Sequence, residues 1–310
     1  MTPDTDQPED KRFPDFFVIG AMKSGSTTLH QYLTMHPRTC MSEPKEPGFF
    51  SRDERYKKGS DWYFEHFRHF EKGQIRGDSS TCYSRSPTYP HSAQRIYDSN
   101  PDAKFIYVVR DPVSRAYSHY KHRMEEAMIQ GGKVISYKQS IVQDEEMLLS
   151  GKYHFQIKKY TDLFGPINIY ICNFDNLITN PLEEMNSVYQ FLGIDSVASL
   201  KQPDLNENIS GTAIKSHLVN AKLNKIKSNI IVRVIRYLTP VIFKKNISIF
   251  LKKVITKSTK DKAIDGTFNS IITSPSKDDI AFLERYYEKD TLLLQQEFKL
   301  NLTSWQSSRR

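Results

Sequence analysis

The stretch FFVIGAMKSGSTTLHQYL, which ends at Leu33, is the feature that most restricts how this chain can fold. Its apolar half, Phe16–Gly20, is typical of a buried parallel strand, and Thr27–Leu33 begins a helix. Between the two lies a loop with glycines, a lysine and three consecutive hydroxyl side chains. Glycine lets backbone N–H groups approach an anion, and a helix start favours negative charge. The segment therefore predicts a strand–loop–helix unit suited to a phosphate-like group.

The order of residues separates this loop from the common triphosphate-binding loop. In that loop, G-x-x-x-x-G-K-[ST], the lysine follows the second glycine. Here Lys23 precedes Gly25. Taken alone, the loop is explained equally well as a tight turn with capping hydroxyls and no ligand.

A second strand-to-helix junction favours a ligand. The run KFIYVV, Lys104–Val109, predicts a core strand, and it ends at Arg110. Asp111 and Pro112 are typical of the cap and first position of a helix. Ser118 follows a little over two helical turns later, so it can share a face with Arg110. Because α/β sheets bind ligands at the carboxyl ends of their strands, we expect both junctions to meet at one edge.

Apolar runs and helical spacing alternate along the first two thirds of the chain. The predicted strands are Phe16–Gly20, Gln74–Asp78, Lys104–Val109 and Ile167–Cys172. The predicted helices are Thr27–Leu33, Ser92–Ser99, Val113–Glu126, Ser136–Ser150, Tyr153–Phe164, Pro181–Leu192 and Lys277–Phe298. This order predicts an α/β fold with a central parallel sheet flanked by helices on both faces. We expect a disordered lead-in over residues 1–13 and a single domain over 14–306.

The net charge of +8 is concentrated in one segment. Residues 215–262 carry thirteen Lys and Arg against one acid, Asp261, so they form a basic arm, which we expect to be a helical C-terminal excursion within the domain. The arm suits contact with an anionic membrane, binding of an acidic polysaccharide, or a packed helix with a solvated basic face. No nucleic-acid reader motif accompanies the charge, so nucleic acid is not expected as a partner.

The sequence lacks the signatures of membrane-spanning, secreted and metal-binding proteins. No apolar run is long enough for a membrane-spanning helix, and the first residues do not resemble a secretory signal. The three cysteines, Cys40, Cys82 and Cys172, are too widely spaced for a metal cluster and are expected to be buried free thiols. We therefore expect a cytoplasmic protein, peripheral to the membrane if the basic arm docks there, and no bound metal.

With these features in place, the sequence resembles a known family. GAMKSGSTTL and YVVRDPVSRAYSHY resemble the two nucleotide-binding signatures of sulfotransferases that use 3′-phosphoadenosine 5′-phosphosulfate (PAPS). The branch is the one with heparan sulfate sulfotransferases and their bacterial relatives. KEPGFF, GKYHFQIKKYTDLFG, IYICNFDNLITNP and VYQFLGI continue the resemblance, and DDIAFLERYYEKDTLLLQQEFKLNLTSW resembles the C-terminal helix and closing tryptophan, so it covers residues 14–306. It implies a P-loop-like sulfotransferase fold and PAPS as co-substrate, with no metal.

The resemblance also implies roles for individual residues. The expected 5′-phosphosulfate contacts are Lys23, Ser24, Gly25, Ser26, Thr27 and Thr28; Arg110 and Ser118 are expected to hold the 3′-phosphate, and Lys215 is a candidate contact for nucleotide or acceptor. Glu46, in KEPGFF, matches the glutamate that removes the acceptor proton, and Lys23 would stabilise the leaving group. Glu43 and Asp78 are the alternative bases.

The expected function is transfer of the sulfuryl group from PAPS to a hydroxyl or amine, with a carbohydrate or glycolipid favoured as acceptor. Heparan sulfate 3-O-sulfotransferases carry a lysine where this chain has Ser79, which argues against the same glycan substrate. One alternative is a phosphate-loop kinase or NTPase, which would need a lysine after the second glycine and a strand-end aspartate for magnesium. The other is a non-catalytic basic protein that binds membranes or polyanions.

Overall fold

A computed structural model of the chain describes residues 12–202, 271–303 and 305. The chain divides into two compact units, and each is described by itself. The first comprises residues 1–119, 141–203 and 276–310, and the second comprises 120–140 and 204–275. Lys215 and the whole basic arm lie outside the described residues.

The first unit is built on a five-stranded sheet with the order β2-β3-β1-β4-β5. The strands are β1 (Phe16–Gly20), β2 (Thr39–Met41), β3 (Ile75–Ser79), β4 (Lys104–Val109) and β5 (Ile169–Asn173). Every neighbouring pair runs parallel, and Phe16 pairs with Gly77 on one side and Lys104 on the other. The predicted parallel α/β architecture is confirmed, with β1 at its centre.

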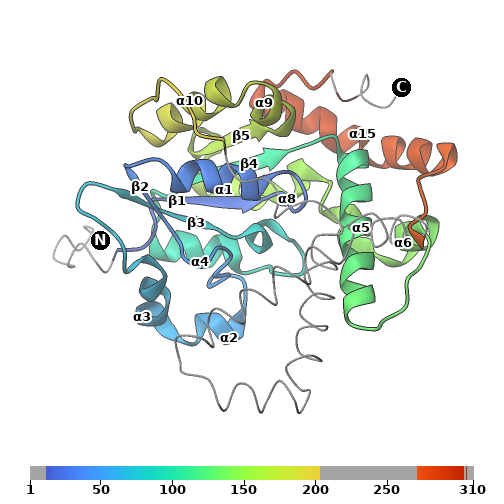
Figure 1. Cartoon of the computed structure of the whole chain (residues 1–310), viewed down its shortest axis with the longest axis horizontal. Coiled ribbons are helices and arrows are strands. Elements are labelled where there is room, and N and C mark those ends of the chain that lie inside the picture. Colours follow the sequence, from blue (N-terminus) through green and yellow to red (C-terminus); the bar gives the residue numbers. More distant parts are fainter. Residues whose placement is uncertain (1–11, 203–270, 304, 306–310) are drawn as a thin grey trace, which may run out of the picture. The chain divides into compact units, whose positions relative to one another are not determined.

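Helices cover both faces of this sheet, and Figure 1 shows α10 on one side and α4 on the other. The described helices are α1 (Ser26–Thr34), α2 (Asp53–Tyr56), α3 (Gly59–Phe64), α4 (Ser92–Ser99), α5 (Pro112–Ile129), α6 (Tyr137–Gln143), α7 (Glu145–Leu149), α8 (Tyr153–Phe164), α9 (Phe174–Thr179), α10 (Pro181–Leu192) and α15 (Lys277–Phe298).

The side chains of β1 divide between two hydrophobic layers. Phe17 and Ile19 pack in the layer that contains residues of α4 and α8, whereas Phe16 and Val18 pack in the layer with α1 and α10. Successive side chains of a strand point to opposite faces, so a strand covered on both sides is apolar throughout. This explains why β1 could be recognised from its sequence.

Three predicted elements differ from the structure by more than one residue. The helix predicted over Val113–Glu126 continues to Ile129 as α5. Ser136–Ser150 is not one helix, because the chain breaks at Asp144, whose carboxylate accepts the Met147 N–H at 2.9 Å and caps α7. The last strand begins at Ile169 rather than Ile167, because a short 3₁₀ turn occupies Pro166–Asn168. The three-residue strand β2 was not predicted.

The second unit is described over residues 120–140 and 271–275. The Tyr120 hydroxyl donates to the Ile135 carbonyl at 3.0 Å, and the Tyr137 N–H donates to the Thr273 hydroxyl at 2.7 Å. The rings of Tyr120 and Tyr137 lie 5.1 Å apart. The bond between Tyr137 and Thr273 joins its two described segments, and the other two contacts lie within residues 120–140.

Candidate active site

The first loop leaves the carboxyl end of β1 and enters α1. Its start is tied to the neighbouring strand, because the Ala21 N–H donates to the Val108 carbonyl at 2.9 Å. Gly25 occupies the cap position of α1 with a φ of 98°, and no side chain caps the helix. The first N–H groups of a helix have no intrahelical acceptor, so this uncapped start suits an anion. The loop residues therefore fit the phosphate-like group that the sequence predicts.

Phe174 lies against this loop from the other side. A Cβ atom built on Gly25 would lie 2.5 Å from the Phe174 ring, so the ring leaves room for glycine alone. The Arg110 guanidinium lies over the same ring, 4.7 Å from its centroid. Phe174 begins α9, directly after β5, so it brings together the two predicted anion-binding segments.

The second junction has the predicted cap. The Asp111 carboxylate accepts the N–H and the hydroxyl of Ser114, at 3.0 and 2.6 Å, as α5 begins. Arg110 is half-buried at the carboxyl end of β4. Ser118 lies further along α5 and is also half-buried. Both polar side chains are therefore partly exposed to solvent.

Glu46 is held at the carboxyl end of β3. Its N–H donates to the carbonyl of Ser79, the last residue of that strand, at 3.1 Å, and its φ is 66°. Lys45 Nζ and the Thr81 hydroxyl both donate to Oε1, at 2.8 and 3.0 Å. Within the described part of the chain, Oε2 has no hydrogen-bond partner, and the side chain is 39% exposed. The carboxylate is thus fixed by one oxygen and open at the other.

The backbone of the Glu46 loop is clamped by Arg55. The guanidinium donates to the Glu46 carbonyl at 3.1 Å and also to the Pro47 carbonyl. Two residues later, the Gly48 N–H donates to Ser80 Oγ at 3.0 Å. The positive φ of Glu46 is unusual for a side chain of this size, so these bonds hold a conformation that the chain would not favour alone.

Asp78 lies beneath this loop and is fully buried. Its carboxylate accepts the hydroxyls of Tyr63 and Tyr83, both at 2.6 Å, and of Ser80 at 2.7 Å. Burial raises its pKa to about 6, against the opposing effect of the three hydroxyl donors. Ser80 is hydrogen-bonded to both Asp78 and Gly48, so the buried aspartate helps to hold the Glu46 loop through Ser80. Both carboxylate oxygens of Asp78 already accept hydrogen bonds, which favours this structural role over a role as the catalytic base.

His30 lies on α1, the helix that follows the first loop. Burial, reinforced by the charge of Lys45, lowers its pKa to about 4, whereas the charge of Glu46 opposes this shift. The imidazole is therefore neutral at physiological pH. Glu43, the other candidate base on the Glu46 loop, is exposed.

The first loop, Arg110 and Glu46 lie at the carboxyl ends of neighbouring strands, whereas Lys215 lies outside the described residues. Strands β3, β1 and β4 are neighbours, and their carboxyl ends carry Glu46, the first loop and Arg110. Sequence reasoning missed four supporting residues, namely Arg55, Thr81, Tyr153 and Phe174. The position of Phe174 directly after β5 is a signal that the strand-end rule could have used.

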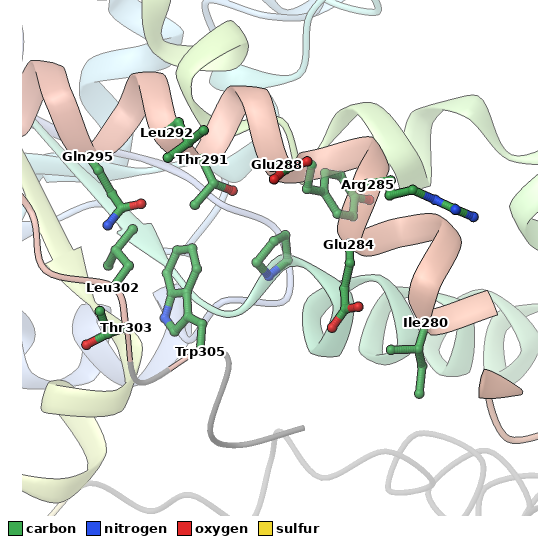
Figure 2. Close-up of a pocket in the computed structure, with 12 residues that line it drawn as sticks. Ile280, Glu284, Arg285, Glu288, Thr291, Leu292, Gln295, Leu302, Thr303 and Trp305 are labelled. Atoms are coloured by element: carbon green, nitrogen blue, oxygen red, sulfur yellow. The ribbon is translucent and has the colours of Figure 1, made fainter. Parts of the chain in front are cut away.

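A cavity of about 620 Å³ lies elsewhere in the first unit (Figure 2). One face of α15, including Glu284 and Glu288, lines it together with Leu302, Trp305 and Pro112. It contains none of the predicted site residues, although Pro112 is two residues from Arg110. The anion-suited chemistry at the strand ends, rather than cavity size, therefore locates the candidate site.

The described part of the chain contains neither a metal-binding cluster nor a membrane-spanning helix. No group of three or more His, Cys, Asp and Glu side chains there is placed to hold a metal ion. None of its helices combines the length and apolar character that crossing a membrane requires. The three cysteines are buried and free, as expected.

Comparisons with known proteins identify the family of this chain. Residues 13–262 match the model of the sulfotransferase domain family. The human bifunctional heparan sulfate N-deacetylase/N-sulfotransferase 3 is 30% identical over 205 residues, which cover 59% of this chain and 22% of that protein. The mouse heparan sulfate glucosamine 3-O-sulfotransferase 5 is 27% identical over 192 residues, which cover 59% of this chain and 54% of that protein. The matched part is therefore about a fifth to a half of the length of these relatives.

A solved structure supports the fold across nearly the whole chain. The crystal structure of a sulfotransferase from Alicyclobacillus acidocaldarius aligns with a TM-score of 0.64 and 21% sequence identity, covering 95% of this chain and 99% of that one. The family match, over residues 13–262, spans well over half of the sequence. The chain therefore belongs to the sulfotransferase family.

Proposed function

We propose that this protein transfers the sulfuryl group of PAPS, the donor that its family uses, to a hydroxyl or amine of a carbohydrate. The observation that carries the proposal is the convergence of the first loop, Arg110 and Glu46 on three neighbouring strand ends. An anion-binding loop, a second cation and a carboxylate with one open oxygen are the groups that such a transfer needs.

The proposed nucleotide contacts are those implied by the family resemblance, and the uncapped start of α1 supports them. The first loop, Lys23 to Thr28, would bind the 5′-phosphosulfate through the uncapped start of α1, with Ser24, Ser26, Thr27 and Thr28 as hydroxyl donors. Arg110 and Ser118 would bind the 3′-phosphate. Lys215 remains a candidate contact that lies outside the described residues.

In the reaction, the acceptor oxygen or nitrogen forms a bond to sulfur as the bond from sulfur to the bridging phosphate oxygen breaks. Glu46 Oε2 takes the acceptor proton, while Lys45 and Thr81 hold Oε1. Lys23 stabilises the negative charge that develops on the leaving 3′,5′-bisphosphate. Positioning and electrostatic stabilisation supply the catalysis, as in phosphoryl transfer.

The nucleotide preference tests the proposal against a phosphate-loop kinase or NTPase. Adenosine 3′,5′-bisphosphate should raise the melting temperature of the protein more than ATP with magnesium does. An equal or larger shift with ATP would contradict the proposal, because an NTPase has no use for a 3′-phosphate.

The role of Glu46 is tested by Glu46→Gln. This variant should bind the bisphosphate as the wild type does and lose transfer by a factor on the order of 10²–10⁴, the usual contribution of a general base. Glu43→Gln is the matched control, because Glu43 is an exposed carboxylate on the same loop. Full turnover by Glu46→Gln would remove Glu46 as the base.

The acceptor is proposed from the heparan sulfate relatives. Labelled sulfate should be incorporated from PAPS into a glycan or glycolipid. Two heparosan samples, one with free amines and one with acetylated amines, then distinguish transfer to an amine from transfer to a hydroxyl, because only the first offers amines. Incorporation into neither glycans nor glycolipids would refute a carbohydrate acceptor. A peripheral contact between the basic arm and an anionic membrane is a separate prediction, because that segment lies outside the described residues.

A further inference from the structure

Tyr153 connects α8 to the main chain of Arg110. Its ring is fully buried, and its hydroxyl donates to the Arg110 carbonyl at 2.7 Å. The Arg110 N–H donates back to the same hydroxyl at 3.4 Å. One side chain therefore engages both polar groups of the Arg110 backbone, at the point where β4 ends and the path to α5 begins.

The position of Tyr153 is itself strongly fixed. Its ring meets those of Tyr107 and Trp305 edge-on, with centroids 5.9 and 6.2 Å away. The next two N–H groups, of His154 and Phe155, both donate to the Asp290 carboxylate of α15 at 2.9 Å. A carboxylate at the start of a helix satisfies N–H groups that have no intrahelical acceptor. The hydroxyl is thus presented to Arg110 by a rigid support.

The first loop is linked to Arg110 through Phe174. The Phe174 ring packs against Gly25 of this loop and against the Arg110 guanidinium. Ser24 of the same loop is fully buried, and its Oγ forms no hydrogen bond within the described residues. Arg110 is therefore held at its backbone by Tyr153 and at its side chain by the ring that also contacts the first loop.

We propose that the Tyr153 hydroxyl is a positioning group that fixes the Arg110 backbone beside the first loop and so sets the preference for a nucleotide with a 3′-phosphate. The inference rests on the proposed function, in which Arg110 binds that phosphate. Tyr153 acts through Arg110 and does not touch the transferred group.

The physical reason is the cost of leaving the Arg110 carbonyl without its partner. A buried carbonyl that loses its donor moves or recruits water, and the residue carrying it moves too. The Arg110 side chain would then be held mainly by its contact with the Phe174 ring. The uncapped start of α1 would be unchanged, so the 5′ end of the nucleotide should bind as before.

The test compares two probes on the same proteins by calorimetry: adenosine 3′,5′-bisphosphate and adenosine 5′-monophosphate. In Tyr153→Phe, the affinity for the bisphosphate should fall on the order of tenfold, and the affinity for the monophosphate should change less than about twofold. In turnover, the KM for PAPS should rise while kcat is largely retained.

The matched control is Tyr160→Phe. Tyr160 is a second buried tyrosine of α8, and its hydroxyl also donates to a backbone carbonyl, that of Tyr83, at 2.8 Å. This variant loses a comparable hydrogen bond, and the ratio of its affinities for the bisphosphate and the monophosphate should equal that of the wild type. A third variant, Asp290→Asn, weakens the hydrogen bonds that hold the start of α8. It should lower this affinity ratio by less than Tyr153→Phe does.

The outcomes separate the inference from the proposed function. A wild-type protein that binds both nucleotides equally would refute the proposed function itself. A wild-type preference that survives unchanged in Tyr153→Phe would overturn the inference alone, as would an equal loss of both affinities. If Tyr153→Phe does not fold, the inference is tested with Asp290→Asn instead. A ratio of bisphosphate to monophosphate affinity that equals the wild-type ratio in that variant overturns the inference.

Discussion

Replacing Gly25 by alanine tests the packing of the first loop. Gly25 has a φ of 98°, and an added Cβ would meet the Phe174 ring at 2.5 Å, well inside van der Waals contact. The left-handed backbone costs a non-glycine residue about 1–2 kcal/mol. Overpacking adds about 1–3 kcal/mol, so Gly25→Ala should lower the free energy of unfolding by about 2–5 kcal/mol.

Gly193→Ala is the matched control for the backbone. Gly193 ends α10 with a φ of 80°, and no atom lies within 4 Å of the position its Cβ would take. Both substitutions also reduce the entropy of the unfolded chain, and this effect cancels in the comparison. The two free energies, measured by urea denaturation, should therefore differ by about 1–3 kcal/mol, the overpacking cost.

The clash can also be relieved from the other side. In Gly25→Ala/Phe174→Ala, the loss of the ring should remove the overpacking, so the double variant should be more stable than the sum of the single changes implies. If Gly25→Ala costs no more than Gly193→Ala, or if the two changes are additive, Phe174 does not pack against the loop as described.

Two further perturbations address the Glu46 loop. The pKa of Asp78 is raised from 3.8 to about 6 in the folded state. Between these pH values the folded protein holds a proton on Asp78 that the unfolded chain has lost. The free energy of unfolding should therefore fall by about 3 kcal/mol as the pH rises from 3.8 to 6. Asp78→Asn should lack this slope in denaturation series from pH 4 to 7, and equal slopes would refute the assignment. Arg55→Met should lower kcat on the order of tenfold and leave bisphosphate affinity unchanged, because Arg55 bonds the Glu46 loop rather than the nucleotide segments. Arg95→Met, which loses a bond to the Phe50 carbonyl, should keep kcat, and equal losses in both variants would contradict a specific role for Arg55.

The elements that the sequence predicted well are those whose signals are local. β1 and β4 matched their apolar runs, and Asp111 caps α5 as expected. β2 was missed because three residues, Thr39–Met41, carry no usable pattern, and its pairing with β3 comes from distant sequence.

The residues of the candidate site also fall into two groups, those that local motifs predicted and those that they did not. The loop glycine and lysine, the strand-end arginine and Glu46 could be found from motifs, since each lies in a short recognisable segment. Their supports could not, because Arg55, Thr81 and Phe174 reach the site through contacts between segments that only the folded chain brings together. Spacing along the sequence carries no information about such contacts.

The hydrogen bonds between the start of α8 and the Asp290 carboxylate of α15 affect the order in which parts of the protein can form during its synthesis. All five strands are complete once residue 173 has been made, yet Asp290 is more than a hundred residues further on. At typical translation rates this delay is on the order of ten seconds. A chain still attached to the ribosome can therefore form its sheet before Asp290 is available to hold the start of α8, so Arg110 gains this support only late in synthesis.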